Sequence, residues 1–398
     1  MLPDNYNIIL NNSKQQQTTA NNIKTFGIVS YNIYGNFTNY GSALQSWALC
    51  QSVNKIANGK FQAKLVDYCP DVLKNKNPLQ PFGNMWDKDE QSRKMCELSL
   101  PAIHENFYKF QNFYNTQFNK TLKKYTSENF NEVMTDENLN GFICGSDTIF
   151  CIDEFEGFDD GYYANYPCMK NNYTVAYAVS FGDSHFDETT LKILNDRLKN
   201  FKAIALRESF MLDYVKEHVN VPVKQVIDPT LLLTSSDYEN LIADKLSKTI
   251  PEKFILLYSR RYNSEMEKYA EILSERTGLE IVEISLRATN ADKHIMFYEA
   301  GVEEFLYLSK KAEYIVTNSY HGMIFALQFG RNFTVFSREQ GNSKINELLN
   351  LLGLSYKLAV HADDDIKPDI NYDSVYKILN VERKEALNFL ESELNGIN

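Results

Sequence analysis

The chain has 398 residues, which is enough for two or three domains and a sizeable core. Asp and Glu (52) outnumber Lys and Arg (41), and an acidic chain without a basic block is a poor candidate for nucleic-acid binding. Hydrophobic residues make up 43% and charged residues 23%, so disorder over the whole chain is excluded.

The sequence also indicates the cellular compartment of the protein. No apolar stretch approaches the ~20 residues of a transmembrane helix. The polar, Asn- and Gln-rich residues 1–23 are expected to form a disordered lead rather than a signal peptide. The six cysteines contain no C-x-x-C pair, which favours reduced thiols over a disulfide framework or a zinc site. Together these features predict a cytoplasmic protein.

Strands and helices alternate through the first half of the chain. Apolar runs predict strands, and apolar residues at helical spacing predict the helices between them. Residues 70–138, rich in Phe and Tyr, are expected to form a mostly helical insertion whose best helix is 103–118. The predicted strands are 24–31, 62–68, 141–144, 173–180, 203–206 and 221–227, and the other helices are 42–56, 187–199 and 208–217.

The same alternation restarts after a boundary expected between 228 and 253, which includes a polar helix at 236–248. The predicted strands are 254–258, 280–284, 314–317 and 333–336, and the helices are 264–277, 302–311, 320–329, 345–352 and 373–394. Two alternating blocks predict an α/β protein with two Rossmann-like domains. We expect these domains at 24–235 and 236–370, with 371–398 packing back on the first.

Ligands of such folds bind at the carboxyl ends of the strands. The first strand-end loop, 35–41, is rich in Gly and Asn but does not match G-x-G-x-x-G, so a dinucleotide is not indicated. The tripeptide Gly145-Ser146-Asp147 follows the third strand. Asp147 is a candidate base or sugar-hydroxyl acceptor, and the alternative is an Asp that caps the next turn.

Three arginines follow predicted strands. Arg207 is placed to meet an anion, although an Arg207–Glu208 surface pair would be as common. Arg260 and Arg338 follow strands of the second block. Cations that converge on one cleft of an acidic chain would make a local anion site.

His321 follows the strand 314–317. With Ser319 or Asn318 as N-cap, it lies in the first turn of a helix, where the dipole favours the neutral imidazole. Such a histidine is suited to proton transfer, whereas a lone histidine is often structural. The other five are expected at the surface: His104, His185, His218, His294 and His361. Metal and Walker motifs are missing from the sequence, so we expect no metal and no cofactor.

These motifs, in this order, resemble the polysaccharide pyruvyl transferase family over about residues 25–354. The matching pieces are Asn39-Tyr40-Gly41-Ser42 with Leu44-Gln45, Gly145-Ser146-Asp147, Arg207-Glu208-Ser209, Asp228-Pro229-Thr230, Ser319-Tyr320-His321-Gly322 and Arg338 through Lys344-Ile345, Leu348-Leu349 and Gly353-Leu354. The resemblance implies a GT-B-like fold, phosphoenolpyruvate as donor and a sugar as acceptor. The implied product is a pyruvate ketal, often on a lipid-linked repeat unit of a capsule or exopolysaccharide.

On the matching positions, the resemblance implies catalytic roles for His321 and Asp147, whose acid and base assignment stays open. The implied donor-binding residues are Arg207, Ser319, Tyr320, Gly322, Arg260 and Arg338, and the implied acceptor-binding residues are Asn39, Tyr40, Gly41 and Ser146. Some members carry an Arg where Ser319 stands, so Arg260 and Arg338 are the expected replacements. The aromatic insertion forms either an acceptor wall or a cap with its own core.

Two alternative functions belong to other classes of protein. One is a GT-B glycosyltransferase that uses a nucleotide sugar, although residues 322–330 lack the carboxylate expected to bind a ribose. The other is a non-catalytic member of the fold that scaffolds a capsule-synthesis complex. If the acceptor is lipid-linked, the enzyme is expected to work at the inner membrane surface without spanning it.

Overall fold

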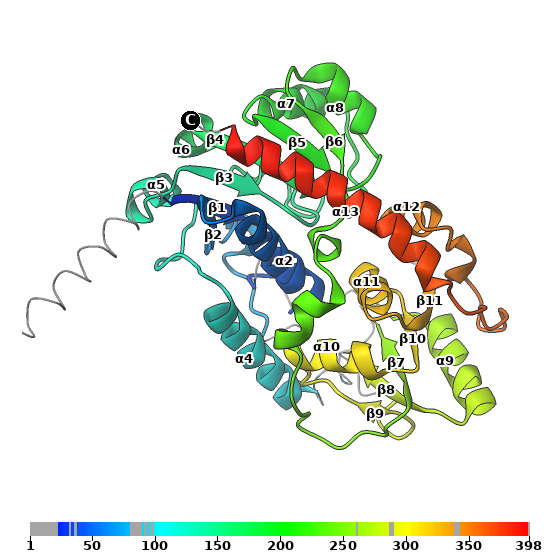
Figure 1. The fold of residues 1–398 in the computed structure, drawn as a ribbon. Helices are drawn as coiled ribbons and strands as arrows, with labels where there is room; N and C mark the ends of the chain where they lie inside the picture. The colour runs from blue at the N-terminus through cyan, green and yellow to red at the C-terminus, as the bar shows by residue number, and fades with distance from the viewer. Residues whose placement is uncertain are drawn as a thin grey trace, which may run out of the picture.

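Two parallel six-stranded sheets, each flanked by helices, form the protein (Figure 1). The computed structural model describes residues 23–31, 33–35, 38–79, 90, 94, 97, 99–259, 262–285, 290–337 and 343–396. The predicted disordered lead, apart from its last residue, lies outside the described residues. The expected α/β fold with two Rossmann-like, GT-B-like domains is confirmed.

The first sheet has the strand order β2-β1-β3-β4-β5-β6, and all its neighbouring strands are parallel. Its strands are β1 (Lys24–Val29), β2 (Phe61–Leu65), β3 (Gly141–Cys144), β4 (Tyr173–Val179), β5 (Ala203–Leu206) and β6 (Val223–Gln225).

The second sheet has the order β12-β11-β10-β7-β8-β9, again all parallel. Its strands are β7 (Phe254–Tyr258), β8 (Glu280–Ile284), β9 (Ile295–Met296), β10 (Tyr314–Thr317), β11 (Asn332–Phe336) and β12 (Leu358–Ala359). The predicted division at 235/236 falls between the two sheets.

Most of the predicted helices form close to their expected positions. The helices are α2 (Tyr40–Ala57), α4 (Leu100–Gln117), α5 (Val133–Asp136), α6 (Pro167–Lys170), α7 (Glu188–Leu198), α8 (Leu212–His218), α9 (Ser264–Thr277), α10 (Val302–Lys311), α11 (Tyr320–Gln328), α12 (Ser343–Leu351) and α13 (Tyr372–Asn395), and the short 3-10 helices are η1 (Asp71–Leu73), η3 (Phe130–Glu132), η4 (Pro229–Leu231), η5 (Ser235–Leu241) and η6 (Ser355–Lys357).

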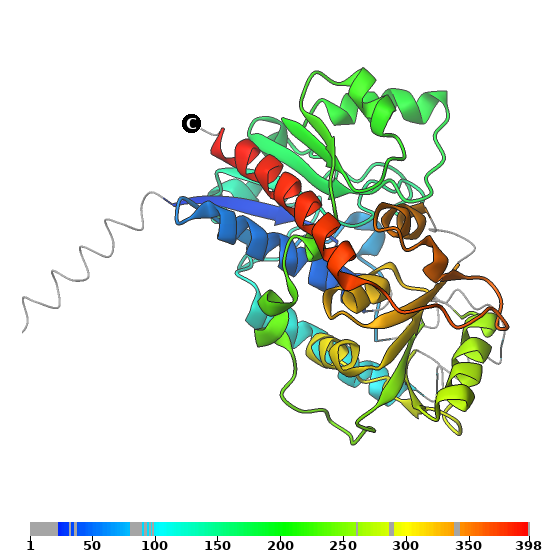
Figure 2. The ribbon, with the colours of Figure 1, turned by 45° about the vertical axis from the view of Figure 1, so that its right-hand side comes forward.

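One hydrophobic core is shared by both sheets. Because side chains alternate along a strand, Phe26 and Ile28 of β1 face α2, while Phe254 and Leu256 of β7 face α10 and α11. All these residues belong to a single buried cluster, which α13 joins as it runs back over the first sheet (Figure 2). The outer face of each sheet has a separate core.

Two predicted helices were wrong in extent. The polar helix expected at 236–248 is only the 3-10 helix η5, because the chain becomes extended at Ile242, and Ile242, Leu246 and Ile250 pack on the shared core instead. The helix expected from residue 208 begins at Leu212, after Met211 adopts a left-handed conformation with φ of 65°.

Within the predicted insertion, α4 confirms the expected helix, and the remaining described helical segments are short. Its aromatic side chains are largely core: Phe110, Phe113, Tyr125 and Phe130 are buried. An acceptor wall built from these rings therefore has little support, although Tyr108 is exposed.

The chain's described helices include none that is both long and apolar enough to cross a membrane. Five of the six cysteines are described, and all five are free thiols; Cys96 lies outside the described residues.

Lys357 is wholly buried at the amino-terminal edge of the second sheet, where its Nζ donates to the carbonyl of Pro368 (2.6 Å) and contacts Asn332 Oδ1. Burial lowers the pKa of Lys357 from 10.5 to about 8. Between these values the unfolded chain binds more protons than the folded one, so this group adds stability as the pH rises.

We therefore expect the free energy of unfolding of the wild type, relative to Lys357→Met, to increase from about pH 8 to about pH 10. Urea denaturation across this range would measure the difference. The exposed Lys384→Met is the control, and parallel pH profiles for the wild type and Lys357→Met would contradict the expectation.

Candidate functional site

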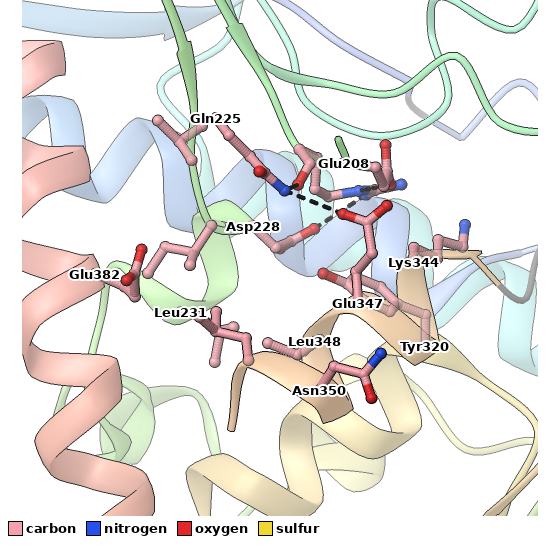
Figure 3. Close-up of a pocket in the computed structure, with 14 residues that line it drawn as sticks. Glu208, Gln225, Asp228, Leu231, Tyr320, Lys344, Glu347, Leu348, Asn350 and Glu382 are labelled. Atoms are coloured by element: carbon pink, nitrogen blue, oxygen red, sulfur yellow. Dashed lines mark hydrogen bonds and ion pairs between the residues drawn. The ribbon is translucent and has the colours of Figure 1, made fainter. Parts of the chain in front are cut away.

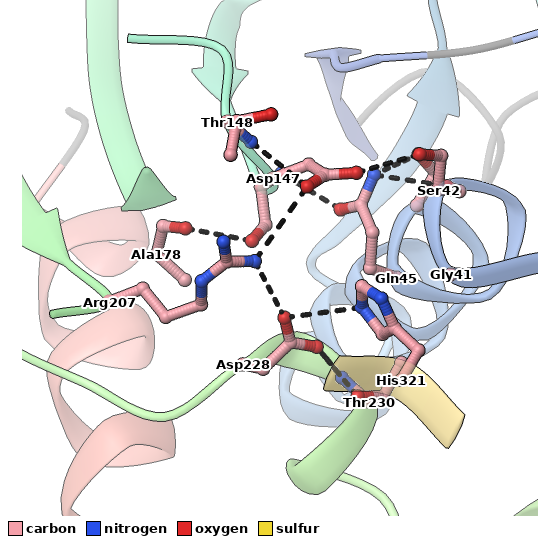
Figure 4. Close-up of polar contacts among 12 residues, drawn as sticks. Gly41, Ser42, Gln45, Asp147, Thr148, Ala178, Arg207, Asp228, Thr230 and His321 are labelled. Atoms are coloured by element: carbon pink, nitrogen blue, oxygen red, sulfur yellow. Dashed lines mark hydrogen bonds and ion pairs between the residues drawn. The ribbon is translucent and has the colours of Figure 1, made fainter. Parts of the chain in front are cut away.

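Each sheet has one point where successive connections turn to opposite sides. In the first sheet it lies between β1 and β3, and in the second between β7 and β10. Such points open a crevice at the carboxyl ends of the strands, which is where ligands bind in α/β folds. The start of α2, the loop after β3 and the start of α11 come together here (Figure 4).

His321 is held in the first turn of α11. Ser319 caps this helix, with its Oγ accepting a hydrogen bond from the Gly322 amide at 3.2 Å, as the sequence predicts. His321 and Tyr320 are both buried, and their ring centres lie 5.3 Å apart. A Cβ on Gly322 would lie 2.6 Å from Thr317 Oγ1, so this glycine permits the close packing of α11 on β10 and β7.

Arg207 sits at the centre of a buried charged cluster. Its side chain is only 1% exposed and meets three carboxylates. Nε donates to Glu208 Oε1 at 2.7 Å, and Nη1 donates to Asp228 Oδ2 at 3.1 Å and lies 3.9 Å from Asp147 Oδ1. The Nη2 atom is buried and makes no hydrogen bond with any described residue.

Asp228 links Arg207 to His321. Its Oδ2 lies 3.5 Å from His321 Nε2, while Oδ1 accepts hydrogen bonds from the amide (2.9 Å) and hydroxyl (2.6 Å) of Thr230. Burial alone would raise the pKa of Asp228, but His321, Arg207 and Thr230 outweigh it and hold that pKa well below its usual range. Asp228 is therefore a carboxylate at neutral pH and can orient the imidazole.

Asp147 follows β3 and approaches Arg207, which follows β5 of the same sheet. Its Oδ2 accepts from Ser42 Oγ at 2.7 Å, and its Oδ1 accepts from the Thr148 amide at 2.9 Å. Its backbone φ is 76°, a conformation that Asp tolerates better than most residues. Burial raises the pKa of Asp147, but Arg207 and His321 more than offset this, so the pKa is lowered.

Gly41, in the first turn of α2, packs directly against His321 of α11. A Cβ at this position would lie 2.0 Å from His321 Nδ1, so only glycine leaves room for the imidazole. The first domain thus supplies the surface against which a histidine of the second domain packs.

Other residues predicted to bind the acceptor have internal partners. Tyr40 donates its hydroxyl to the Ala300 carbonyl at 2.7 Å, and its ring stacks on Phe305 with centres 4.5 Å apart. Ser146 is wholly buried, with its Oγ donating to the Ala178 carbonyl at 2.7 Å. Asn39 caps α2. The predicted donor-binding residues Arg260 and Arg338 lie outside the described residues.

Sequence reasoning gave Asp228 no role, although the residue directly follows a predicted strand, as Arg207 does. The same strand-end rule would have singled it out. In addition, His294 was wrongly expected at the surface: it is buried, and its Nδ1 lies 2.7 Å from Glu283. His104, His185, His218 and His361 are exposed as expected.

The chain has relatives among solved structures at low sequence identity. Among solved structures, the chain is similar to a UDP-N-acetylglucosamine 2-epimerase from Rickettsia bellii (12% identity, 94% of this chain and 98% of that chain, TM-score 0.48). It is also similar to a UDP-GlcNAc 2-epimerase from Methanocaldococcus jannaschii (13% identity, 91% and 93%, TM-score 0.48). A search of curated proteins found no match.

The family model described as polysaccharide pyruvyl transferase matches residues 39–340, which is most of the chain. This range includes the α2 cap, the loop after β3, Arg207, Asp228 and the start of α11. The chain therefore belongs to the polysaccharide pyruvyl transferase family.

Proposed function

We propose that the protein transfers the pyruvyl group of phosphoenolpyruvate to a sugar and forms a pyruvate ketal. The observation that carries the proposal is the convergence of Arg207, Asp228, His321 and Asp147 where the carboxyl ends of the two sheets meet. This cluster combines a cation for an anionic donor with groups able to move protons. The acceptor we propose is a lipid-linked hexose such as galactose, used in capsule or exopolysaccharide biosynthesis at the inner membrane surface.

The pKa shifts of the two aspartates favour one assignment of roles within the cluster. Asp147 and Asp228 both have a lowered pKa, so at neutral pH neither has a proton to donate. His321 is the remaining proton-transfer group of the cluster, and its Nε2 lies 3.5 Å from Asp228 Oδ2. We assign His321 as the general acid and Asp147 as the hydrogen-bond acceptor for a sugar hydroxyl.

In the proposed reaction, His321 gives a proton to the methylene carbon of phosphoenolpyruvate, and the neighbouring carbon becomes electrophilic. One sugar hydroxyl adds to that carbon and loses its proton, and the C–O bond to phosphate breaks. The second hydroxyl then adds to the same carbon and closes the ring. One hydroxyl proton replaces that taken from His321, and the other leaves with phosphate, so the products are a ketal and inorganic phosphate.

Phosphate release from phosphoenolpyruvate, measured with a panel of free and lipid-linked hexoses, tests the proposal. We expect acceptor-dependent release and, in D2O, a ketal methyl group that carries one deuterium from solvent. A product that retains its methylene group would contradict ketal formation. Turnover of UDP-sugars without release from phosphoenolpyruvate would instead support a glycosyltransferase.

Gly41→Ala provides a steric test. The added methyl group would collide with His321 Nδ1 and displace the imidazole, so we expect phosphate release to fall about 100-fold. Gly396→Ala is the matched control, since its Cβ would meet only ordinary contacts of 3.6 Å or more. Unchanged turnover in Gly41→Ala would show that the His321 position is unimportant for the reaction.

A further inference from the structure

A wholly buried amide side chain lies at the contact between α2 and the loop that carries Asp147. Gln45 stands in the second turn of α2 and is 0% exposed. Figure 4 shows it between Ser42 and this loop. The buried face of a helix is usually apolar, because burial of an amide costs free energy unless its polar atoms are hydrogen-bonded. A glutamine at this position therefore needs partners at both ends of its amide.

Both ends of the Gln45 amide have such partners. Its Nε2 donates to Ser30 Oγ (2.8 Å), Ser46 Oγ (2.8 Å) and the Ser42 carbonyl (3.0 Å). Its Oε1 accepts from the backbone amide of Ser146 at 3.0 Å. A carbonyl can only accept and a backbone N–H can only donate, so these contacts fix which end of the amide faces α2 and which faces the loop.

The contacts of Gln45 converge on Asp147 from two sides. Ser146 directly precedes Asp147 in the chain, and Ser42 Oγ donates to Asp147 Oδ2 at 2.7 Å. The backbone φ of Asp147 is 76°, a conformation that its surroundings must maintain. Gln45 thus ties the turn of α2 that bears Ser42 to the loop that bears Asp147.

Gln45 has no direct access to a ligand. A cavity of about 410 Å³ opens beside the charged cluster, with Arg207 and Asp228 in its wall (Figure 3). Gln45 does not line this cavity, and no part of the residue reaches the surface. Any effect of Gln45 on a reaction must therefore pass through its neighbours.

We propose that Gln45 is a positioning residue, which holds Asp147 where the hydroxyl of the sugar acceptor meets it. The inference rests on the proposed function, in which Asp147 accepts a hydrogen bond from that hydroxyl. An apolar residue of similar length would fill the same space but would leave the Ser146 amide without its partner. The loop after β3 would then lose this connection to α2, and Asp147 would no longer be held at one position.

A double-mutant cycle with Gln45→Met and Asp147→Asn tests the inference. We expect Gln45→Met alone to lower kcat/KM for the hexose identified by the acceptor panel about 10-fold, because it displaces a group that meets the substrate. In the Asp147→Asn background the same change should cost less than about 2-fold, since the group that Gln45 positions is already altered. A residue needed only for packing would cause the same loss in both backgrounds, and that result would overturn the inference.

Asn54→Ala is the matched control. Asn54 lies on the same helix, and its Oδ1 accepts from the Ala63 amide at 2.8 Å, so this change also removes a hydrogen bond between α2 and the first sheet. Asn54 lies about 18 Å farther along the helix axis than Ser42, so its replacement should leave kcat/KM at the wild-type value. Thermal unfolding checks that each variant is folded. Gln45→Glu, which keeps the acceptor for the Ser146 amide but loses the N–H donors, gives the same comparison if Gln45→Met does not fold.

The same cycle measured by urea denaturation does not depend on turnover. The loss of unfolding free energy in the double variant should be smaller than the sum of the two single losses, whereas the losses for Asn54→Ala and Asp147→Asn should add. If the wild type released no phosphate from phosphoenolpyruvate, the proposed reaction would fail, yet this non-additivity would still support the link between Gln45 and Asp147. If the wild type turned over and the kinetic losses simply multiplied, the reaction would stand and the positioning role of Gln45 would be wrong.

Discussion

Replacement of His321 by glutamine is expected to lower kcat for phosphate release from phosphoenolpyruvate by about 10²- to 10⁴-fold, the usual contribution of general acid–base catalysis. Glutamine keeps a polar group near the position of Nε2, 3.5 Å from Asp228, but it cannot carry a proton at neutral pH. The donor should still bind, because Arg207, the cation proposed to meet it, is unchanged in this variant. Steady-state kinetics and calorimetry with phosphoenolpyruvate would separate the two effects.

The matched control is His185→Gln, since the His185 side chain is 92% exposed and lies outside the cluster. It should retain wild-type kinetics. If His321→Gln kept more than a tenth of wild-type kcat, His321 would not be the proton donor. If it instead bound no phosphoenolpyruvate, the role of His321 would be in donor binding.

Asp228→Asn is expected to impair both stability and activity. The carboxylate is wholly buried between Arg207 and His321, and removal of one charge from such a network typically costs about 3–5 kcal/mol in the free energy of unfolding. Asparagine can still accept from the Thr230 amide, so the fold around η4 should persist. Phosphate release should fall at least about 100-fold, because His321 loses the group that orients it.

The pH dependence of stability distinguishes a lost charge from a lost contact. The pKa of Asp228 is depressed in the fold, so its contribution is present above the unfolded value and is lost as the pH falls. The stability difference between wild type and Asp228→Asn should therefore shrink below about pH 4. Asp196→Asn, which removes a 78%-exposed carboxylate, should change stability little at any pH. A difference that stayed constant with pH would indicate a packing defect.

The strands could be predicted closely where short apolar runs are bounded by charged residues. The strand β5 (Ala203–Leu206) lies between Lys202 and Arg207 and has the bounds predicted for it. The two-residue strands β9 and β12 were not predicted, because so few residues carry no periodic pattern. The late start of α8 depends on the left-handed Met211 and on Ser209 being held by Glu347, more than 130 residues away.

The sequence was sufficient to predict which loops form the candidate site, but not which side chains contact one another in it. Strand-end reasoning located Asp147, Arg207 and His321, which the structure brings into one cluster. The linking position of Asp228 depends on partners at 207 and 321, and only the fold makes them neighbours. Tyr40 illustrates the opposite case: its motif suggested a ligand contact, whereas its ring is enclosed by Phe110, Tyr258 and Phe305.

The hydrophobic cluster shared by the two sheets has a consequence for protein engineering. A chimera that combined the first sheet of one relative with the second sheet of another would be joined between β6 and β7. The two halves of the shared cluster would then come from different proteins, and so would the two sides of the contact between Gly41 and His321. Each half expressed alone would expose the apolar faces of α2 or of α10 and α11 to water and would be prone to aggregate. Acceptor preference is therefore better altered by grafting single strand-end loops than by exchanging whole halves between relatives, and the intact chain should melt in one transition.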